Sequence, residues 1–188
     1  MSSIPPSCDN TSVGVIISDG HQRFLVSDHT TGRPGVAPVS GHIDGNPSPE
    51  RAAYTEVLEE AGLVIASVRL ADAGWRRNSC RRLPGPAGVG HTWWIFTAAV
   101  RDPELRPSPR ETRNMRWAAK KELQLLAERT AAYARGETPG AGWMAEPGIA
   151  PVWVHWLARA GLVTVPPDDL RIIDDLAAVP MTAGQGTR

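Results

Sequence analysis

Residues 41–63 read GHIDGNPSPERAAYTEVLEEAGL, and this stretch decides the fold. Ser48 followed by Pro49 is typical of a helix start, because serine accepts a hydrogen bond from a first-turn amide and proline suits the first helical position. Gly62 is suited to the left-handed residue that follows a helix. The stretch therefore predicts a helix from Pro49 to about Ala61.

One face of this helix is apolar. At about 100° per residue, Ala53, Val57 and Ala61 form a stripe, and Leu58 lies at its edge. We expect the stripe to pack against the core.

The acidic residues Glu56, Glu59 and Glu60 gather on a separate arc of the same helix. Like charges three or four residues apart cost a few tenths of a kcal/mol per pair unless they are neutralised. Mg²⁺ takes oxygen ligands, and a bound metal can polarise a phosphoryl group and activate water. An ordinary solvated helix face has the same spacing, so the spacing alone leaves both interpretations open.

The frame around these acids resembles the Nudix box, whose signature is G-x₅-E-x₇-R-E-U-x-E-E-x-G-U, with U aliphatic. The matching positions are Gly41, Glu56, Val57, Glu59, Glu60, Gly62 and Leu63. The chain departs from the signature at Pro47, where the family has Glu, and at Thr55, where it has Arg. An opening hairpin and a later segment, Glu111 to Trp117, also resemble the family, so the likeness covers roughly residues 12–130.

The resemblance implies an α/β fold, the Nudix-type α/β/α sandwich with a mixed β-sheet between helices. It implies a pyrophosphohydrolase that cleaves a diphosphate linkage in a nucleoside diphosphate derivative or nucleotide. It also implies dependence on Mg²⁺ or Mn²⁺.

The resemblance further implies roles for single residues. Glu59 and Glu60 match metal ligands, and Glu56 matches a ligand or the general base. The carbonyl of Gly41 matches a further ligand. Glu111 matches a later acid that completes the metal site or acts as base, although a surface glutamate in a loop is the commoner explanation.

Four residues are candidates for binding the substrate. Arg81 and Arg82 lie in a basic run within a predicted loop, and arginine offers paired donors to phosphate oxygens. Arg23, on the opening hairpin, is a similar candidate. Trp94 could stack on a nucleobase. Each has a plain alternative, a solvated basic loop for the arginines and core packing for the tryptophan.

Hydrophobic patterning predicts the remaining elements. The expected strands are 13–18, 23–27, 39–43, 63–70, 91–98 and 115–117, and the expected helices are 120–135 and 152–160. Trp93 and Trp94 are adjacent in a strand, so they should face opposite sides of the sheet. Trp153 and Trp156 have helical spacing and indicate a packing stripe. Residues 76–90, rich in Arg, Pro and Gly, are expected to form a long loop.

These elements predict one domain. We expect a flexible N-terminal lead at residues 1–10, a single Nudix-type domain with a C-terminal helical extension at 11–179, and a flexible tail at 180–188.

Composition excludes several classes of partner. The chain has 20 Lys plus Arg against 20 Asp plus Glu, so no net field favours a long nucleic acid or an anionic membrane. Its longest apolar runs are too short to span a bilayer, and we expect a cytoplasmic protein.

The cysteines and histidines point to no site in the sequence. Cys8 and Cys80 form neither a disulfide framework nor metal-ligand pairs, and we expect free thiols in a reducing compartment. We expect His42 and His91 to be satisfied polar residues rather than ligands.

Two rival functions remain. A catalytically impaired Nudix-like nucleotide-binding or sensor module would explain Pro47 and Thr55. A Nudix-like isomerase of isoprenoid diphosphates is disfavoured, because neither cysteine has a recognisable catalytic setting.

Overall fold

The secondary structure confirms the α/β class. A computed structural model describes residues 7–29, 34–107 and 112–179. Its strands are β1 (Thr11–Ser18), β2 (Arg23–His29), β3 (Val36–Ala37), β4 (Val39–His42), β5 (Ile65–Arg76), β6 (His91–Val100) and β7 (Thr112–Ala119). Its helices are α1 (Pro49–Ala61), α2 (Lys120–Ala134), α3 (Gly140–Ala145), α4 (Pro151–Arg159) and α5 (Pro167–Ala178).

The strands form one seven-stranded mixed sheet built around β1. β1 pairs in parallel with β6, and it pairs antiparallel with β4 along its first half and with β2 at its end. β5 adds to β6, and both β3 and β7 add to β2. Because β1 is central, its register fixes how the neighbouring strands present their side chains.

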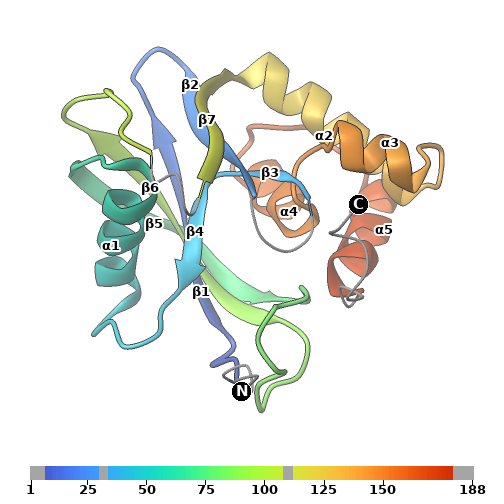
Figure 1. The fold of residues 1–188 in the computed structure, drawn as a ribbon, viewed down its shortest axis with the longest axis horizontal. Coiled ribbons are helices and arrows are strands. Elements are labelled where there is room, and N and C mark those ends of the chain that lie inside the picture. Colours follow the sequence, from blue (N-terminus) through green and yellow to red (C-terminus); the bar gives the residue numbers. More distant parts are fainter. Residues whose placement is uncertain (1–6, 30–33, 108–111, 180–188) are drawn as a thin grey trace, which may run out of the picture.

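Helices cover both faces of this sheet (Figure 1). Alternate residues of β1 separate the two cores, since Val13, Val15 and Ile17 pack with α1, whereas Ile16 packs with α2, α4 and α5. Gly14 faces the second core, where a Cβ would overlap the ring of Trp153. The predicted α/β/α sandwich is confirmed.

The predicted aromatic positions are confirmed as well. Trp93 packs in the core beneath α4, and Trp94 packs in the core beneath α1. Trp153 and Trp156 are fully buried on α4. The ring centroids of Trp93 and Trp153 lie 5.8 Å apart, edge to face. Most of these indoles therefore serve packing.

Of the flexible lead expected at residues 1–10, residues 1–6 lie outside the described residues, whereas residues 7–10 pack against the rest of the chain. Residues 7–10 are described, and the Cys8 amide donates to the Leu83 carbonyl at 2.8 Å. Asn10 is buried, and its side-chain amide donates to the carbonyls of Gly88 and Gly90. The segment therefore lies side by side with the loop 77–90 that joins β5 to β6 (bottom of Figure 1). The proposed tail at 180–188 lies outside the described residues.

The C-terminal part also holds more helix than the pattern predicted. α3 contains two glycines and has no side-chain N-cap, so its sequence does not favour a helix. Tertiary packing supports it, because the Trp143 ring stacks on Tyr133 with centroids 4.5 Å apart. None of the described helices is both long enough and apolar enough to cross a membrane.

Candidate active site

α1 forms as predicted and presents its apolar stripe to the sheet. The Ser48 side chain accepts a hydrogen bond from the Arg51 amide, and Gly62 ends the helix with a left-handed φ of 66°. Val57 and Ala61 are fully buried, whereas Leu58 is exposed. The opposite arc is therefore left to the acidic residues.

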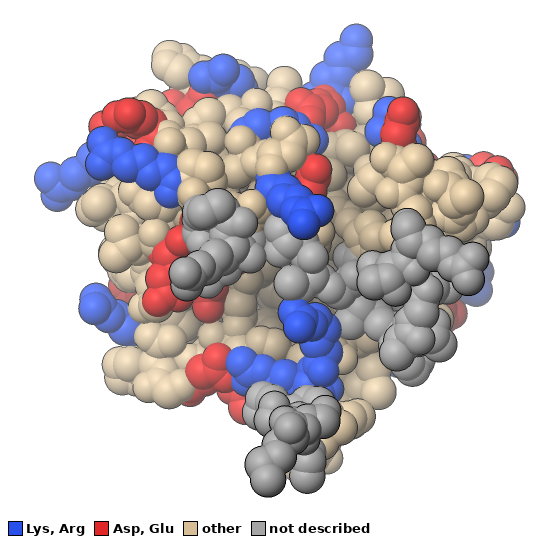
Figure 2. Space-filling view, in the orientation of Figure 1, with Lys and Arg blue, Asp and Glu red and all other residues tan. Residues whose placement is uncertain are grey.

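The three acids of α1 line its open side at different depths. Glu56 and Glu60 are half-buried and Glu59 is exposed. In Figure 2, acidic side chains gather on the surface over α1, beside a depression in the middle of this face. Glu59 therefore contacts solvent, and Glu56 and Glu60 are partly accessible to it.

Gly41 lies directly against one of these acids. A Cβ built on Gly41 would overlap both the carboxylate carbon and an oxygen of Glu56. β4 pairs with β1 so that Gly41 is opposite Val13, and this register holds the glycine beside the middle of the helix. A side chain at position 41 would displace the Glu56 carboxylate, so glycine here has a steric cause.

The two departures from the family signature, Thr55 on α1 and Pro47 in the loop before it, are linked through Asn46. Thr55 donates a hydrogen bond from its hydroxyl to Asn46 Oδ1 at 3.2 Å, and the same hydroxyl is 3.1 Å from the Arg51 carbonyl. Asn46 in turn donates to the Ile43 carbonyl through its backbone and side-chain amides. Asn46 directly precedes Pro47, so Thr55 connects the helix to the loop that contains Pro47.

Trp94 is brought towards the acids by the sheet. Val13 pairs with Gly41 on one side and with Trp94 on the other. Residues opposite one another on neighbouring strands share a face, so Trp94 lies on the α1 face about 10 Å from Gly41, at about 4.8 Å per strand. Its side chain is half-buried.

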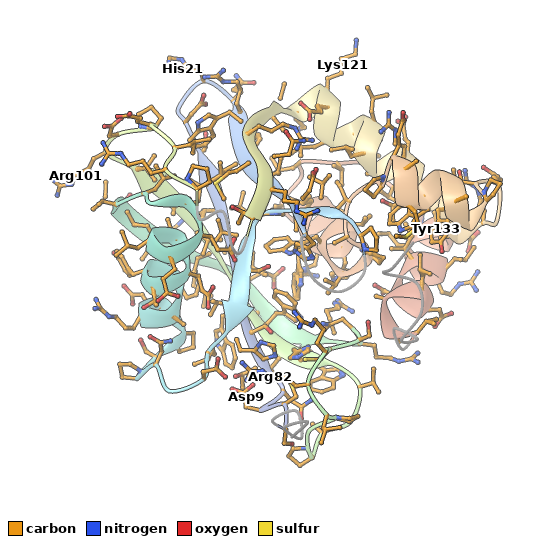
Figure 3. All side chains as sticks on the ribbon, viewed as in Figure 1. Asp9, His21, Arg82, Arg101, Lys121 and Tyr133 are labelled. Carbon is orange, nitrogen blue, oxygen red and sulfur yellow. The ribbon has the colours of Figure 1, made fainter. Side chains whose placement is uncertain are left out.

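Arg82 forms an ion pair with Asp44, which lies in the loop between β4 and α1. Its guanidinium forms a two-pronged ion pair with Asp44, and this pairing holds the pKa of the Asp44 carboxyl below its ordinary value. Figure 3 shows Arg82 at the end of β4, next to Asp9. Arg81, beside it in the chain, is exposed. Because the Arg82 guanidinium already pairs with Asp44, Arg82 is a weaker candidate for binding substrate phosphate.

Arg23 is placed away from Gly41. It follows the turn after β1, and its side chain pairs with Asp19 at 2.6 Å. Gly41 lies opposite Val13 near the start of β1, so about five residues of strand, or roughly 17 Å, separate the two levels. The remaining candidate, Glu111, lies outside the described residues.

The structure brings together four residues for which the sequence predicted no site, namely Cys8, His42, Cys80 and His91. The cysteines are free thiols, as expected. Burial raises the pKa of the Cys8 thiol. At Cys80 burial acts in the same direction, but hydrogen bonds from His42 and His91 outweigh it and lower the pKa to about 5. Sequence reasoning therefore missed a group of four side chains that lie close enough together to hold a metal ion.

The chain resembles known proteins over most of the described sheet and α1. The model of the NUDIX domain matches residues 9–137. A protein from Saccharophagus degradans described as an RNA pyrophosphohydrolase is 31% identical over 119 residues, which cover 57% of this chain and 70% of that protein.

Two solved structures are similar to this chain at low sequence identity. A NUDIX hydrolase from Nitrosomonas europaea is 19% identical, with a TM-score of 0.49, over 62% of this chain and 76% of its own. A MutT protein from Methanosarcina mazei Go1 is 16% identical, with a TM-score of 0.48, over 65% and 83%.

Proposed function

The chain belongs to the NUDIX domain family, and from this membership we propose the metal, the substrate class and the residues that act in it. The predicted family, the fold class and the assignment as a hydrolase of phosphoric anhydride bonds are confirmed. The chain is therefore a Nudix-type pyrophosphohydrolase.

The proposed metal is Mg²⁺ or Mn²⁺, held by Glu59, Glu60 and the Gly41 carbonyl, with Glu56 as a further ligand or as the general base. The observation that carries this proposal is the fit of the Glu56 carboxylate against Gly41, in the space where any other residue has its Cβ. Oxygen ligands from carboxylates and a backbone carbonyl are those that hard cations prefer. A bound divalent ion would offset phosphate charge and make a coordinated water more acidic.

The proposed chemistry assigns different tasks to the acids. Glu59 and Glu60, about one helical turn from Glu56, bind the metal ion on the open side of α1. Glu56, buried more deeply than Glu59 and backed by Gly41, accepts a proton from the attacking water. Glu111 is the second candidate for the base. Attack on one phosphorus of a diphosphate then yields two phosphorylated fragments.

The proposed substrate is a small nucleotide-like molecule, such as a nucleoside diphosphate derivative. Trp94 is the best placed of the predicted binding residues, because it shares a face of the sheet with Glu56. Arg81 is exposed and is the better candidate of the two neighbouring arginines for contacting phosphate, because Arg82 is held by Asp44. Arg23 is the least favoured because the register sets it far from Gly41.

A substrate screen tests this proposal. The protein would be incubated with Mg²⁺ and nucleoside di- and triphosphates, dinucleotides or nucleotide sugars, and released phosphate and nucleoside monophosphate would be measured. We expect turnover of at least one small nucleotide. Since the relative from Saccharophagus degradans is described as acting on RNA, 5′-triphosphorylated RNA belongs in the screen, and exclusive turnover of that RNA would contradict the small-substrate proposal.

The sensor alternative has its own outcome in this screen. It is motivated by Pro47 and Thr55, but these residues leave the three acids in place, and Thr55 restores a link to the loop through Asn46. Saturable nucleotide binding without turnover of any compound would favour the sensor over the enzyme.

A further inference from the structure

Four metal-ligating side chains meet near the end of β4, on the opposite face of the sheet from the acids. One ligand atom from each of Cys8, His42, Cys80 and His91 lies within 4.8 Å of all the others. Cys8 Sγ is 3.5 Å from His42 Nε2 and 3.1 Å from His91 Nε2. Cys80 Sγ is 3.4 Å from His42 Nε2.

These separations match the edges of a tetrahedral zinc site. Zn–S bonds of about 2.3 Å and Zn–N bonds of about 2.0–2.1 Å at the tetrahedral angle put sulfur and nitrogen about 3.5 Å apart. These three sulfur–nitrogen distances lie within a few tenths of an ångström of this value. Two thiolates and two imidazoles are a donor set that selects zinc among the common cellular cations.

Neighbouring groups hold the ligands in the orientation that a metal requires. The Nδ1 atom of the His91 ring is 2.9 Å from Asn78 Oδ1, so this nitrogen carries the proton and Nε2 is left with its lone pair. Backbone amides donate to both sulfurs at 3.3 Å, from Asn10 to Cys8 and from Arg82 to Cys80. Donors of this kind stabilise thiolates.

The four ligands come from four separate pieces of chain. Cys8 belongs to the N-terminal segment, His42 is the last residue of β4, Cys80 lies in the loop 77–90, and His91 opens β6. Asn10 already fastens this loop, since its side chain accepts from Ala87 and donates to Gly88 and Gly90. A metal held here would close the N-terminal segment and the loop onto the sheet.

The surroundings suit a structural ion. All four positions of the tetrahedron are filled by protein, which is the arrangement of structural zinc rather than of catalytic zinc with an open position. Cys8 and His91 are buried, and Cys80 and His42 are half-buried. A cavity of about 180 Å³ borders both cysteines of the cluster and is also lined by Asn78.

We propose that Cys8, His42, Cys80 and His91 bind one structural Zn²⁺ that fixes the N-terminal segment and the loop 77–90 to the end of β4. The cysteines bind as thiolates and release their protons to solvent on metal binding. Because His42 follows Gly41, the ion also stabilises the strand end against which Glu56 rests.

Metal analysis of the wild-type protein tests the proposal directly. The untagged chain would be purified without chelator, its metals counted by mass spectrometry, and its zinc examined by X-ray absorption. We expect about one zinc per chain with two sulfur and two nitrogen ligands at about 2.3 Å and 2.0–2.1 Å. Chelation should lower the melting temperature and expose the loop 77–90 to protease, and added Zn²⁺ should reverse both effects.

Single substitutions assign the ion to these side chains. Cys8→Ser and Cys80→Ser should each lose most of the zinc, and Asn78→Ala should weaken its binding by about tenfold to a hundredfold. His21→Asn, at the exposed hairpin turn, is the matched control and should keep full zinc content. These readouts do not depend on turnover, so they separate this proposal from the proposed function.

Three results would overturn the proposal. The first is a wild-type chain that neither carries zinc nor takes it up at equimolar Zn²⁺. The second is a Cys8–Cys80 disulfide in protein purified under reducing conditions, seen as a mass lower by two hydrogens. The third is zinc with oxygen ligands only, which would place the ion on the acidic helix.

Discussion

The acidic cluster of α1 and the Cys/His cluster at the end of β4 lie on opposite faces of the sheet, on either side of β4. Gly41 lies against Glu56 on one face of the sheet, and His42, the next residue, joins the Cys/His cluster on the other. The acidic cluster comes from one helix and offers oxygen atoms that are partly open to solvent. The Cys/His cluster comes from four segments and offers sulfur and nitrogen atoms that are largely closed off.

The two sets of donor atoms suit two different roles for a bound metal ion. Oxygen ligands with water and substrate completing the shell suit a cation that takes part in turnover. A closed set of sulfur and nitrogen ligands suits an ion that contributes to folding. Changes in the first cluster should therefore reduce catalysis, and changes in the second should reduce stability and zinc content.

The largest effect on catalysis is expected for Glu56→Gln. The variant keeps the shape of the side chain but cannot accept a proton, so kcat should fall by on the order of a hundredfold or more, with a smaller change in KM. Steady-state kinetics on the nucleotide found in the screen would measure both.

Glu50→Gln is the matched control for that variant. Glu50 lies in the first turn of the same helix and is exposed, away from the acidic cluster. Its kcat should stay within about twofold of the wild type, as for most surface substitutions away from special features. If Glu56→Gln lost less than about threefold in kcat, Glu56 would not be the base, and Glu111→Gln would be the next variant.

The second effect concerns the glycine shared by the strand and the acid. Gly41→Ala places a methyl group where the Glu56 carboxylate lies, so the carboxylate must move. Loosened catalytic geometry can cost on the order of tenfold to a hundredfold in turnover. Gly45→Ala is the control, because its Cβ would meet nothing within 4 Å. Equal kcat values for the two folded variants would contradict a role for the Gly41–Glu56 contact.

A smaller effect is expected from the residues that replace the family's Arg and Glu. Thr55→Val removes the hydroxyl that reaches Asn46 and should cost about 1 kcal/mol in the free energy of unfolding. In a double-mutant cycle, Pro47→Glu and Thr55→Arg should show a favourable coupling of about 0.5 to 3 kcal/mol in transition-state free energy if Glu and Arg at these two positions form an ion pair. Strict additivity would mean that the two departures arose independently.

The smallest effect is expected for Arg82→Ala. Its ion pair with Asp44 is partly exposed, so the loss of stability should stay below about 1 kcal/mol. The KM should change little, since Asp44 already occupies the guanidinium. A KM raised by about tenfold or more would instead make Arg82 a phosphate clamp, and Arg81→Ala would show whether its neighbour shares that role.

The sequence predicted the acidic helix well because its signals are local. The cap at Ser48, the left-handed Gly62 and the three- and four-residue spacing of the acids all lie within one stretch. The contact between Gly41 and Glu56 depends on the pairing of β4 with β1, and the sequence did not predict it, although the family resemblance implied that both residues belong to one metal site.

The Cys/His cluster could not be predicted by the same reasoning. Its ligands are spread from Cys8 to His91, without the short spacings of a zinc finger, and the N-terminal segment resembled a loose lead. Sheet register and the path of the loop 77–90 bring them together. The alternation of side chains along β4 predicts that His42 faces away from Glu56. Only the folded structure shows which residues lie beside His42.

The most direct test of the separation between the two clusters is the Mg²⁺ dependence of thermal stability in the wild type, Glu60→Gln and Glu50→Gln, with zinc content measured on the same samples. Millimolar Mg²⁺ should raise the melting temperature of the wild type and of Glu50→Gln, because the ion binds the folded state preferentially. Glu60→Gln should lose most of that rise and keep its full zinc content. An undiminished Mg²⁺ shift in Glu60→Gln, or a loss of zinc from it, would contradict two separate sites and remove Glu60 from the catalytic one.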